Sequence, residues 1–215
     1  MTLTATAEPS APTAPEANPV LHTILTRRSA PARLPDEPNR ATIQLLLDAA
    51  NHAPNHGLTQ PWRFFVLRGD ARREYAAAVA EDQIADHLSR SLPTPDGWDD
   101  QCRTHNAQSF LRSPIVIAVY CVSAQRPNLP DWEELVATAA AVENLLLAAH
   151  ALGLGAAIKS RACPLPRAAA WLGLPPHAQL TGHVLLGYAD PTVAPRPKPR
   201  RPAEDFTTWL GWDQF

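Results

Sequence analysis

Two short segments in the first part of the sequence contain residue types that could bind an anionic or planar ligand. Arg27, Arg28 and Ser29 close a predicted helix. There they could hold an anion through charge-assisted hydrogen bonds, or simply complement the helix dipole. His52 and His56 flank a Pro-Asn turn. Two histidines in one turn favour a functional role about as strongly as a structural hydrogen-bonding role.

Two later segments are equally ambiguous on their own. The small residues of Gly153–Ala157 would let a flat ligand approach the backbone closely, but a helix C-cap followed by a strand explains them equally well. The basic run 196–201 is most often a solvated tail. The sequence contains no catalytic triad, Walker loop or G-x-G-x-x-G fingerprint, so no side chain is assigned as catalytic.

Composition narrows the class of protein. The chain has 215 residues, 19 basic and 21 acidic side chains and a net charge of −2. It therefore lacks the broad positive field that holds nucleic acid or an anionic membrane. Three cysteines without C-x-x-C spacing predict neither a disulfide framework nor a metal site. The only lysines are Lys159 and Lys198, so both are informative by their rarity.

The N-terminal residues 1–19 are rich in Pro, Ala and Thr and lack the basic and apolar regions of a secretory signal. We expect a disordered leader over 1–19 and one folded domain over 20–215. No apolar run reaches the roughly 18 residues of a membrane span. A cytoplasmic protein is therefore expected.

Hydrophobic periodicity predicts mixed helices and strands without a regular βαβ period, which favours an α+β fold. Helices are expected over 20–29, 41–53, 70–90, 132–152 and 165–172, and strands over 62–67, 114–122, 155–160 and 183–188. Residues 91–101 are expected to form an irregular excursion or lid. The middle of the long helix, 139–147, is apolar nearly all round, which indicates burial in the core or at a dimer interface.

Taken in order, five segments resemble the nitroreductase family. They are Arg27–Ser29, Ala53–Trp62, Ala141–Gly155, Gly187–Tyr188 and Lys198–Pro202, and the resemblance covers about residues 20–205. It implies a central, mainly antiparallel sheet flanked by helices, a long buried central helix and an interlocked homodimer that binds FMN between its subunits. The apolar helix 139–147 and the aromatic C-terminal end support a dimer on independent grounds.

The resemblance also implies which residues bind FMN. Arg27, Arg28 and Ser29 match the segment that holds the phosphate and ribityl chain. Ile158, Lys159 and Ser160 match the segment along the isoalloxazine edge, where backbone N–H groups can bond the flavin. In many members, residues matching Lys198 and Arg200 complete the phosphate site.

The turn before Trp62 departs from the family pattern. It reads Asn-His-Gly-Leu-Thr over 55–59, so Leu58 replaces the usual flavin-contacting Asn. This resembles a short, compact branch of the family in which residues matching His52 and His56 reach FMN from the partner subunit. In that branch the C-terminal basic pair is often absent.

The activity implied by the resemblance is that of an FMN-dependent NAD(P)H oxidoreductase. NAD(P)H delivers hydride to the flavin and leaves, and an acceptor such as a nitroaromatic or quinone then takes the electrons in a ping-pong cycle. Lys159 is a candidate for stabilising the reduced flavin. The alternatives are a non-catalytic flavin-binding protein, a structural or interaction module that has lost flavin, and a flavin-fragmenting or dehalogenating relative.

Overall fold

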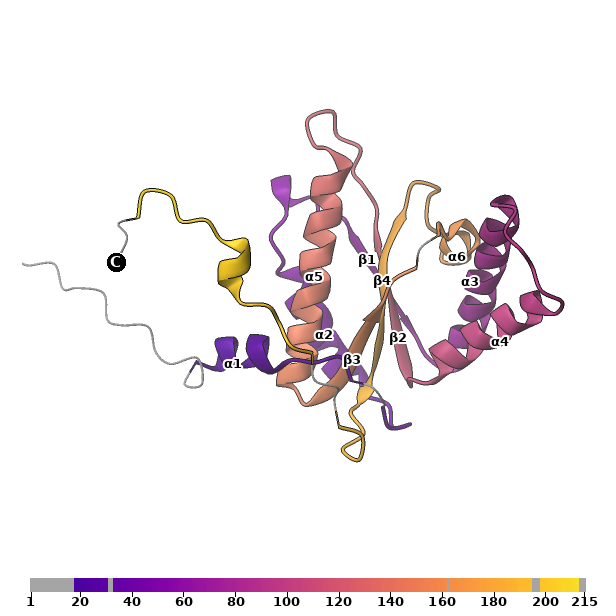
Figure 1. Cartoon of the computed structure of the whole chain (residues 1–215), viewed down its shortest axis with the longest axis horizontal. Helices are drawn as coiled ribbons and strands as arrows, with labels where there is room; N and C mark the ends of the chain where they lie inside the picture. The colour runs from indigo at the N-terminus through magenta and orange to yellow at the C-terminus, as the bar shows by residue number, and fades with distance from the viewer. Residues whose placement is uncertain (1–17, 31–32, 162, 195–197, 213–215) are drawn as a thin grey trace, which may run out of the picture.

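The computed structural model of the protein describes residues 18–30, 33–161, 163–194 and 198–212 (Figure 1). The expected leader lies outside the described residues except for its last two positions. The first described residue, Asn18, caps the helix α1 (Pro19–Thr26), because its side-chain oxygen accepts the N–H groups of Val20 and Leu21.

A single four-stranded sheet forms the centre of the fold. Its strands are β1 (Trp62–Leu67), β2 (Ile115–Cys121), β4 (Gln179–Tyr188) and β3 (Leu154–Lys159), in that spatial order. All three pairings are antiparallel, as predicted. Every residue of β2 is buried, which explains why this strand is a continuous apolar run rather than an alternating one. β3 lies at one edge of the sheet.

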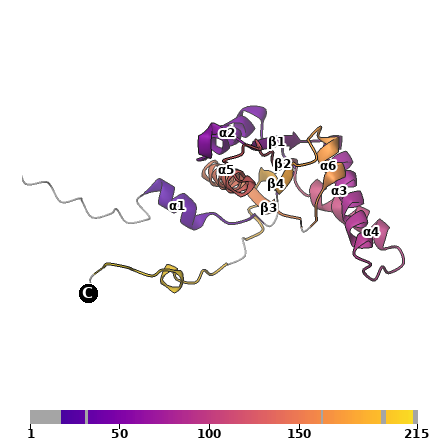
Figure 2. The ribbon, with the colours of Figure 1, turned by 90° about the horizontal axis from the view of Figure 1, so that it is seen from above.

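Helices cover both faces of the sheet (Figures 1 and 2). The helices α2 (Arg40–Asn51) and α5 (Asp131–Ala151) lie on one face, and α3 (Asp70–Ser89), α4 (Trp98–Leu111) and α6 (Pro166–Trp171) lie on the other. Each face has its own apolar cluster, with Leu145 on the α5 side and Phe110 on the α4 side. This arrangement confirms the expected α+β class.

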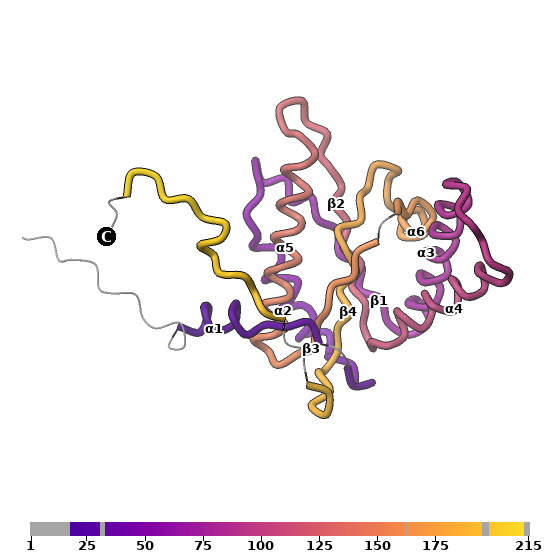
Figure 3. The backbone as a smooth tube through the Cα atoms, viewed as in Figure 1, coloured from indigo at the N-terminus to yellow at the C-terminus, as the bar shows by residue number. Residues whose placement is uncertain are grey.

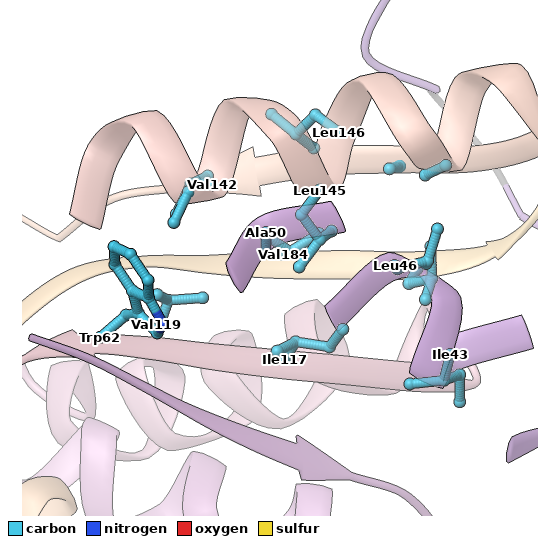
Figure 4. Packing of buried hydrophobic residues seen from close by; sticks show 14 of the residues in the cluster. Ile43, Leu46, Ala50, Trp62, Ile117, Val119, Val142, Leu145, Leu146 and Val184 are labelled. Carbon is cyan, nitrogen blue, oxygen red and sulfur yellow. The ribbon is translucent and has the colours of Figure 1, made fainter. Parts of the chain in front are cut away.

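The core on the α5 side follows directly from helical spacing. Ile43, Leu46 and Ala50 recur on one face of α2 and are all buried, as predicted. Figure 4 shows these side chains beside Ile117 of β2, and Leu145 of α5 belongs to the same cluster.

The long helix α5 has the length and apolar composition of a membrane span, yet it is packed as a core helix. It contacts α2 and the strands β2, β3 and β4. Its buried Glu134 accepts hydrogen bonds from the Ser123 hydroxyl and the Ala124 N–H. One stripe of the helix stays uncovered within the chain, where Trp132 and Val136 are 63% and 59% exposed.

Two expectations about local structure were wrong. Residues 91–101 are not irregular throughout, because α4 begins at Trp98. Gly97 takes the left-handed conformation that starts the helix, and the Trp98 ring stacks on His87 at 3.9 Å. The second concerns the first helix, which was expected over 20–29: α1 ends at Thr26, and it has no buried residue although its apolar spacing is helical. Val20 and Ile24 are instead exposed.

Two short 3-10 helices complete the described elements, η2 (His56–Leu58) and η3 (Ala203–Phe206). The segment 198–212, which includes η3, extends away from the sheet on the side of α5 (Figure 3). Its large apolar side chains are exposed, including Phe206, Trp209 and Leu210.

A pair of adjacent leucines tests the packing of α2. Leu46 is fully buried, whereas Leu45 is 58% exposed. Leu46→Ala should lower the free energy of unfolding by about 2–5 kcal/mol, because it leaves a cavity in the core. Leu45→Ala should change it by no more than about 0.5 kcal/mol. Chemical denaturation of both variants measures the difference, and equal losses would contradict the register given for this helix.

Candidate functional site

The segment after α1 lies against the edge strand β3. The N–H of Ala30 donates to the carbonyl of Ala156 at 3.0 Å. Gly155 permits this approach, because a Cβ at that position would lie 3.0 Å from the Cβ of Ala30 and 2.9 Å from the Cα of Ala189. Of the two interpretations of Gly153–Ala157, the structure shows the helix end followed by a strand, and at Gly155 the close approach is made by Ala30 and Ala189 of the same chain.

The edge of β3 beyond this contact identifies which backbone groups are available to a ligand. In an antiparallel pair, successive residues direct their N–H and C=O groups to opposite edges. The backbone carbonyl of Ala156 points away from the sheet to Ala30, so the backbone N–H and C=O groups of Ile158 also point away from the sheet. The backbone groups of Lys159 point the other way, to its partner His183 on β4. The predicted backbone contact is thus available at Ile158, and Ser160 continues the same alternation one residue beyond the strand.

The basic residues after α1 have partners within the chain. The Nε of Arg27 lies 3.2 Å from Oε1 of Glu143 on α5. Arg28 donates from Nη1 to the carbonyl oxygens of Leu25 and Arg27, both at 2.8 Å. Arg28 therefore does what a cation at a helix C-terminus is expected to do. The half-buried Arg27 and Ser29 remain the stronger anion-binding candidates.

The two predicted histidines lie at the end of α2 and in the turn that follows it, and His56 contacts the N-terminal end of α5. His52 follows α2, where its Nδ1 lies 2.8 Å from the carbonyl oxygen of Asp48. His56 Nδ1 lies 2.8 Å from Oε2 of Glu133. Glu133 and the Arg27 partner Glu143 are ten residues apart on α5, which is about 15 Å along the axis. Within one chain the structure does not bring Arg27 and His56 together.

An apolar cavity of about 510 Å³ lies between α1, α2 and α5. Its polar lining comes from Thr23, His52 and Asn144, and its apolar walls include Ile24 and Leu147. The cavity is open because α1 buries none of its own residues against the rest of the chain.

Lys159 points to the opposite face of the sheet. Its Nζ donates to the hydroxyl of the buried Ser109 on α4 at 2.6 Å. Burial lowers the pKa of Lys159, and the nearby cations, above all Arg161, lower it further. Lys159 thus carries a destabilised positive charge next to the outward-facing edge of β3. Sequence reasoning missed Arg161 and Ser109, because only the fold brings α4 beside residues 159–161.

The predicted C-terminal basic pair lies in the extended segment 198–212. Both residues are exposed, and Arg200 donates to the carbonyl of Lys198 at 3.4 Å. Residues 196–197 of the basic run lie outside the described residues, and Arg201 pairs with Asp205 at 2.9 Å. The assignment of Lys198 and Arg200 to a phosphate site stays a prediction.

A buried polar chain runs behind Lys159. The Tyr75 hydroxyl lies 2.9 Å from the Tyr120 hydroxyl and 2.9 Å from Nε2 of His183. Burial, followed by the neighbouring Arg161, lowers the pKa of His183 to about 3, and burial raises that of Tyr120 to about 12. All three side chains are therefore neutral near pH 7. In the described part of the chain, no cluster of three or more His, Cys, Asp or Glu could hold a metal.

Comparison with known proteins places this arrangement in a family. The sequence profile of the nitroreductase family matches residues 24–188. The chain belongs to the nitroreductase family. YdjA of Escherichia coli strain K12, named as a candidate NAD(P)H nitroreductase, is 29% identical over 170 residues, which cover 78% of this chain and 86% of YdjA. A 4-nitrobenzoate reductase of Nocardioides sp. is 23% identical over 224 residues, covering 87% of each chain.

Solved structures share the fold. A nitroreductase-like family protein of Bacillus cereus superposes with a TM-score of 0.74 at 24% identity, over 95% of this chain and all of that one. The FMN-dependent nitroreductase NfnB of Mycobacterium smegmatis, solved in complex with NADPH, superposes with a TM-score of 0.68 at 21% identity, over 89% of this chain and 98% of that one. The nitroreductase-like fold predicted from the sequence is thus confirmed.

The depressed pKa of His183 predicts a specific pH dependence of stability. The unfolded state takes up a proton near pH 6.5, but the folded state does so only near pH 3. Stability is therefore lost as pH falls through this window, by about 1.4 kcal/mol per unit and about 2–3 kcal/mol between pH 6.5 and 4.5. Denaturation at several pH values should show a shallower slope for His183→Asn. The exposed control His105→Gln should keep the native slope, and an unchanged slope in His183→Asn would contradict a buried neutral imidazole.

Proposed function

We propose that this protein is a cytoplasmic, FMN-dependent NAD(P)H oxidoreductase that reduces nitroaromatics, quinones or related electron-poor acceptors. The observation that carries the proposal is the edge of β3. There Ala30 binds the backbone of Ala156, while the backbone N–H and C=O groups of Ile158 point outward. Relatives support it through their names, which include a NAD(P)H nitroreductase candidate and a 4-nitrobenzoate reductase. NfnB, whose fold this chain shares, is named as FMN-dependent and was solved with NADPH.

The residues around β3 fit a bound flavin. Gly155 brings the Arg27–Ala30 segment onto the strand, so that a cationic segment and an outward-facing strand edge adjoin. Bound FMN would supply the electron transfer between NAD(P)H and the acceptor. In this arrangement Arg27 and Ser29 bind the phosphate and ribityl chain, Ile158 and Ser160 orient the ring through their N–H groups, and Lys159 contributes positive charge.

We propose further that the active unit is a homodimer with shared flavin sites. Three surfaces of the single chain are apolar and exposed: helix α1, the Trp132–Val136 stripe of α5 and the segment 198–212. Uncovered apolar surface of this extent favours association. Because Arg27 and His56 contact residues of α5 that lie about 15 Å apart along its axis, His56 is assigned to the flavin held by the partner subunit, and His52 is assigned with it from the family resemblance.

A second candidate is a synthase reaction on the same fold. The observation that favours it is a relative named 5,6-dimethylbenzimidazole synthase, from Rhodospirillum rubrum, that is 25% identical over 184 residues, covering 82% of this chain and 81% of the relative. A reductase oxidises NAD(P)H in proportion to the acceptor and keeps its flavin. Loss of the flavin during turnover would favour the synthase reaction.

The assignment of Arg27 predicts the flavin content of a variant. Wild-type protein should bind about one FMN per chain. Arg27→Ala should weaken FMN binding about ten- to a hundredfold, because one charge-assisted hydrogen bond contributes roughly 1.5–3 kcal/mol. Fluorescence titration of apoprotein with FMN measures both affinities, with the exposed Arg73→Ala as the matched control. Equal FMN affinity in Arg27→Ala and wild type would remove Arg27 from the site.

Shared sites predict complementation between two defective variants. Arg27→Ala and His56→Ala homodimers should each be flavin-poor. When the two are unfolded and refolded together, heterodimers should regain one intact site of two, so flavin content should rise to about half of wild type in that fraction. Differently tagged chains allow the heterodimer to be isolated and its flavin measured. Heterodimers that form but remain flavin-poor would show that both residues serve the same subunit's site.

A further inference from the structure

Helix α4 and Ser113, which follows it, carry neutral oxygen acceptors that bind four cations. Asn106 and Ser109 lie on the helix, and all three residues are buried. The Asn106 amide oxygen accepts from Nη2 of Arg161 at 2.9 Å, and the Ser109 hydroxyl accepts from Lys159. The other two cations, Arg33 and Arg72, donate to the hydroxyl and the carbonyl of Ser113. These contacts orient the cations without neutralising them.

The carboxylates on the neighbouring helix α3 are engaged elsewhere. The buried Asp82 accepts the N–H groups of Arg167 and Ala168 at the start of α6. Glu81 pairs with Arg103 at 2.7 Å, and Asp86 pairs with Arg90 at 3.0 Å. Glu37, beside Arg33, pairs with Arg68. Across the residues that the structure describes, no salt bridge joins a carboxylate to any of the four cations.

Arg161 is the cation for which the missing counter-charge matters most. Its Nε is buried and has no hydrogen-bond partner among the described residues. Its side chain also lies over the Phe110 ring at 5.6 Å. Burial lowers the pKa of Arg161, which means that its positive charge is held at a cost. A half-buried guanidinium without a counter-charge is stabilised by an anion.

A cavity of about 250 Å³ opens beside Arg161, between β4 and α6. Its apolar lining includes Leu165, Ala169, Ala178 and Leu180, and its polar side chains besides Arg161 are Tyr120, Cys163 and Gln179. The cavity is small for a cofactor, since pockets for drug-sized ligands begin near 300 Å³. It combines one fixed planar cation with apolar walls.

We propose that this cavity binds a small monocarboxylate with an apolar body, such as an aromatic acid, through an ion pair with Arg161. A guanidinium matches a carboxylate in a planar, bidentate geometry. The apolar walls favour an acid with one charged group over inorganic phosphate, which would leave most of its oxygens without donors. The acid is either the electron acceptor itself, held by its own carboxylate, or a separate small molecule that binds beside the redox site.

Benzoate and its neutral analogue benzamide test the site by calorimetric titration of the FMN-saturated protein. Wild type should bind benzoate at one site per chain and benzamide at least tenfold more weakly. Arg161→Gln, which can still donate to Asn106, should lose at least tenfold in benzoate affinity and little in benzamide affinity. The control Arg73→Gln, at an exposed position outside the cavity, should bind both like wild type.

A second variant keeps the proposal testable if Arg161→Gln fails to fold. Ala178 is half-buried in the cavity wall, so Ala178→Leu should fill the space and weaken both ligands while circular dichroism stays native. The proposal is overturned if wild type does not bind benzoate, if it binds benzoate and benzamide equally, or if either cavity variant keeps the wild-type benzoate affinity.

Turnover then distinguishes the two sources of the carboxylate. A rise in KM for 4-nitrobenzoate but not for 4-nitrobenzyl alcohol in Arg161→Gln assigns the carboxylate to the acceptor. Unchanged KM values together with lost benzoate binding assign it to a separate acid, and both results support the site. The calorimetric measurement requires no turnover, so its failure is separate from failure of the proposed oxidoreductase activity.

Discussion

An edge strand must have its outward-facing backbone groups satisfied, and the arrangement around β3 depends on how this is done. The chain covers one part of the edge itself, through the hydrogen bond from Ala30 to Ala156. Gly155 makes that contact sterically possible, since any side chain there would meet Ala30 and Ala189. The same alternation leaves Ile158 facing outward. A cationic segment and a free strand edge are therefore placed together by one close backbone approach.

Charge is distributed unequally between the two faces of the sheet. On the α5 face, Arg27 is paired with Glu143, and His56 lies against Glu133. On the α4 face, Lys159 and Arg161 are held by neutral acceptors and remain uncompensated. The buried His183 behind them is neutral and adds no counter-charge. Anionic ligands are therefore favoured on the α4 face, close to the strand edge where the flavin is proposed to bind.

Much of the fold could be predicted from the sequence because its periodicities are local. The spacing of Ile43, Leu46 and Ala50 specifies the buried face of α2, and the unbroken apolar run of β2 specifies a central strand. The helix α4 was not predicted, because its composition is polar and its start depends on the conformation of Gly97. The exposed helix α1 shows a second limit of prediction from sequence, because apolar spacing alone does not specify which part of the protein covers a helix.

Only those residues of the candidate site that belong to short motifs in a fixed order along the chain could be predicted. Arg27–Ser29 and 158–160 are recognisable because they follow one another in a family pattern, and the structure brings the adjoining residues Ala30 and Ala156 into contact. Arg161, Ser109 and Asn106 could not be found in this way. Their relation arises from long-range packing between α4 and the end of β3, which no short sequence motif records.

The most direct test of the account is anaerobic reduction of the FMN-loaded protein by NADH and by NADPH. Absorbance of the oxidised flavin should disappear with about one equivalent of at least one nucleotide, and it should return when an electron-poor acceptor such as a quinone is added. Flavin that is bound at about one per chain but keeps its absorbance with both nucleotides would contradict the oxidoreductase assignment and identify a non-catalytic flavin-binding protein.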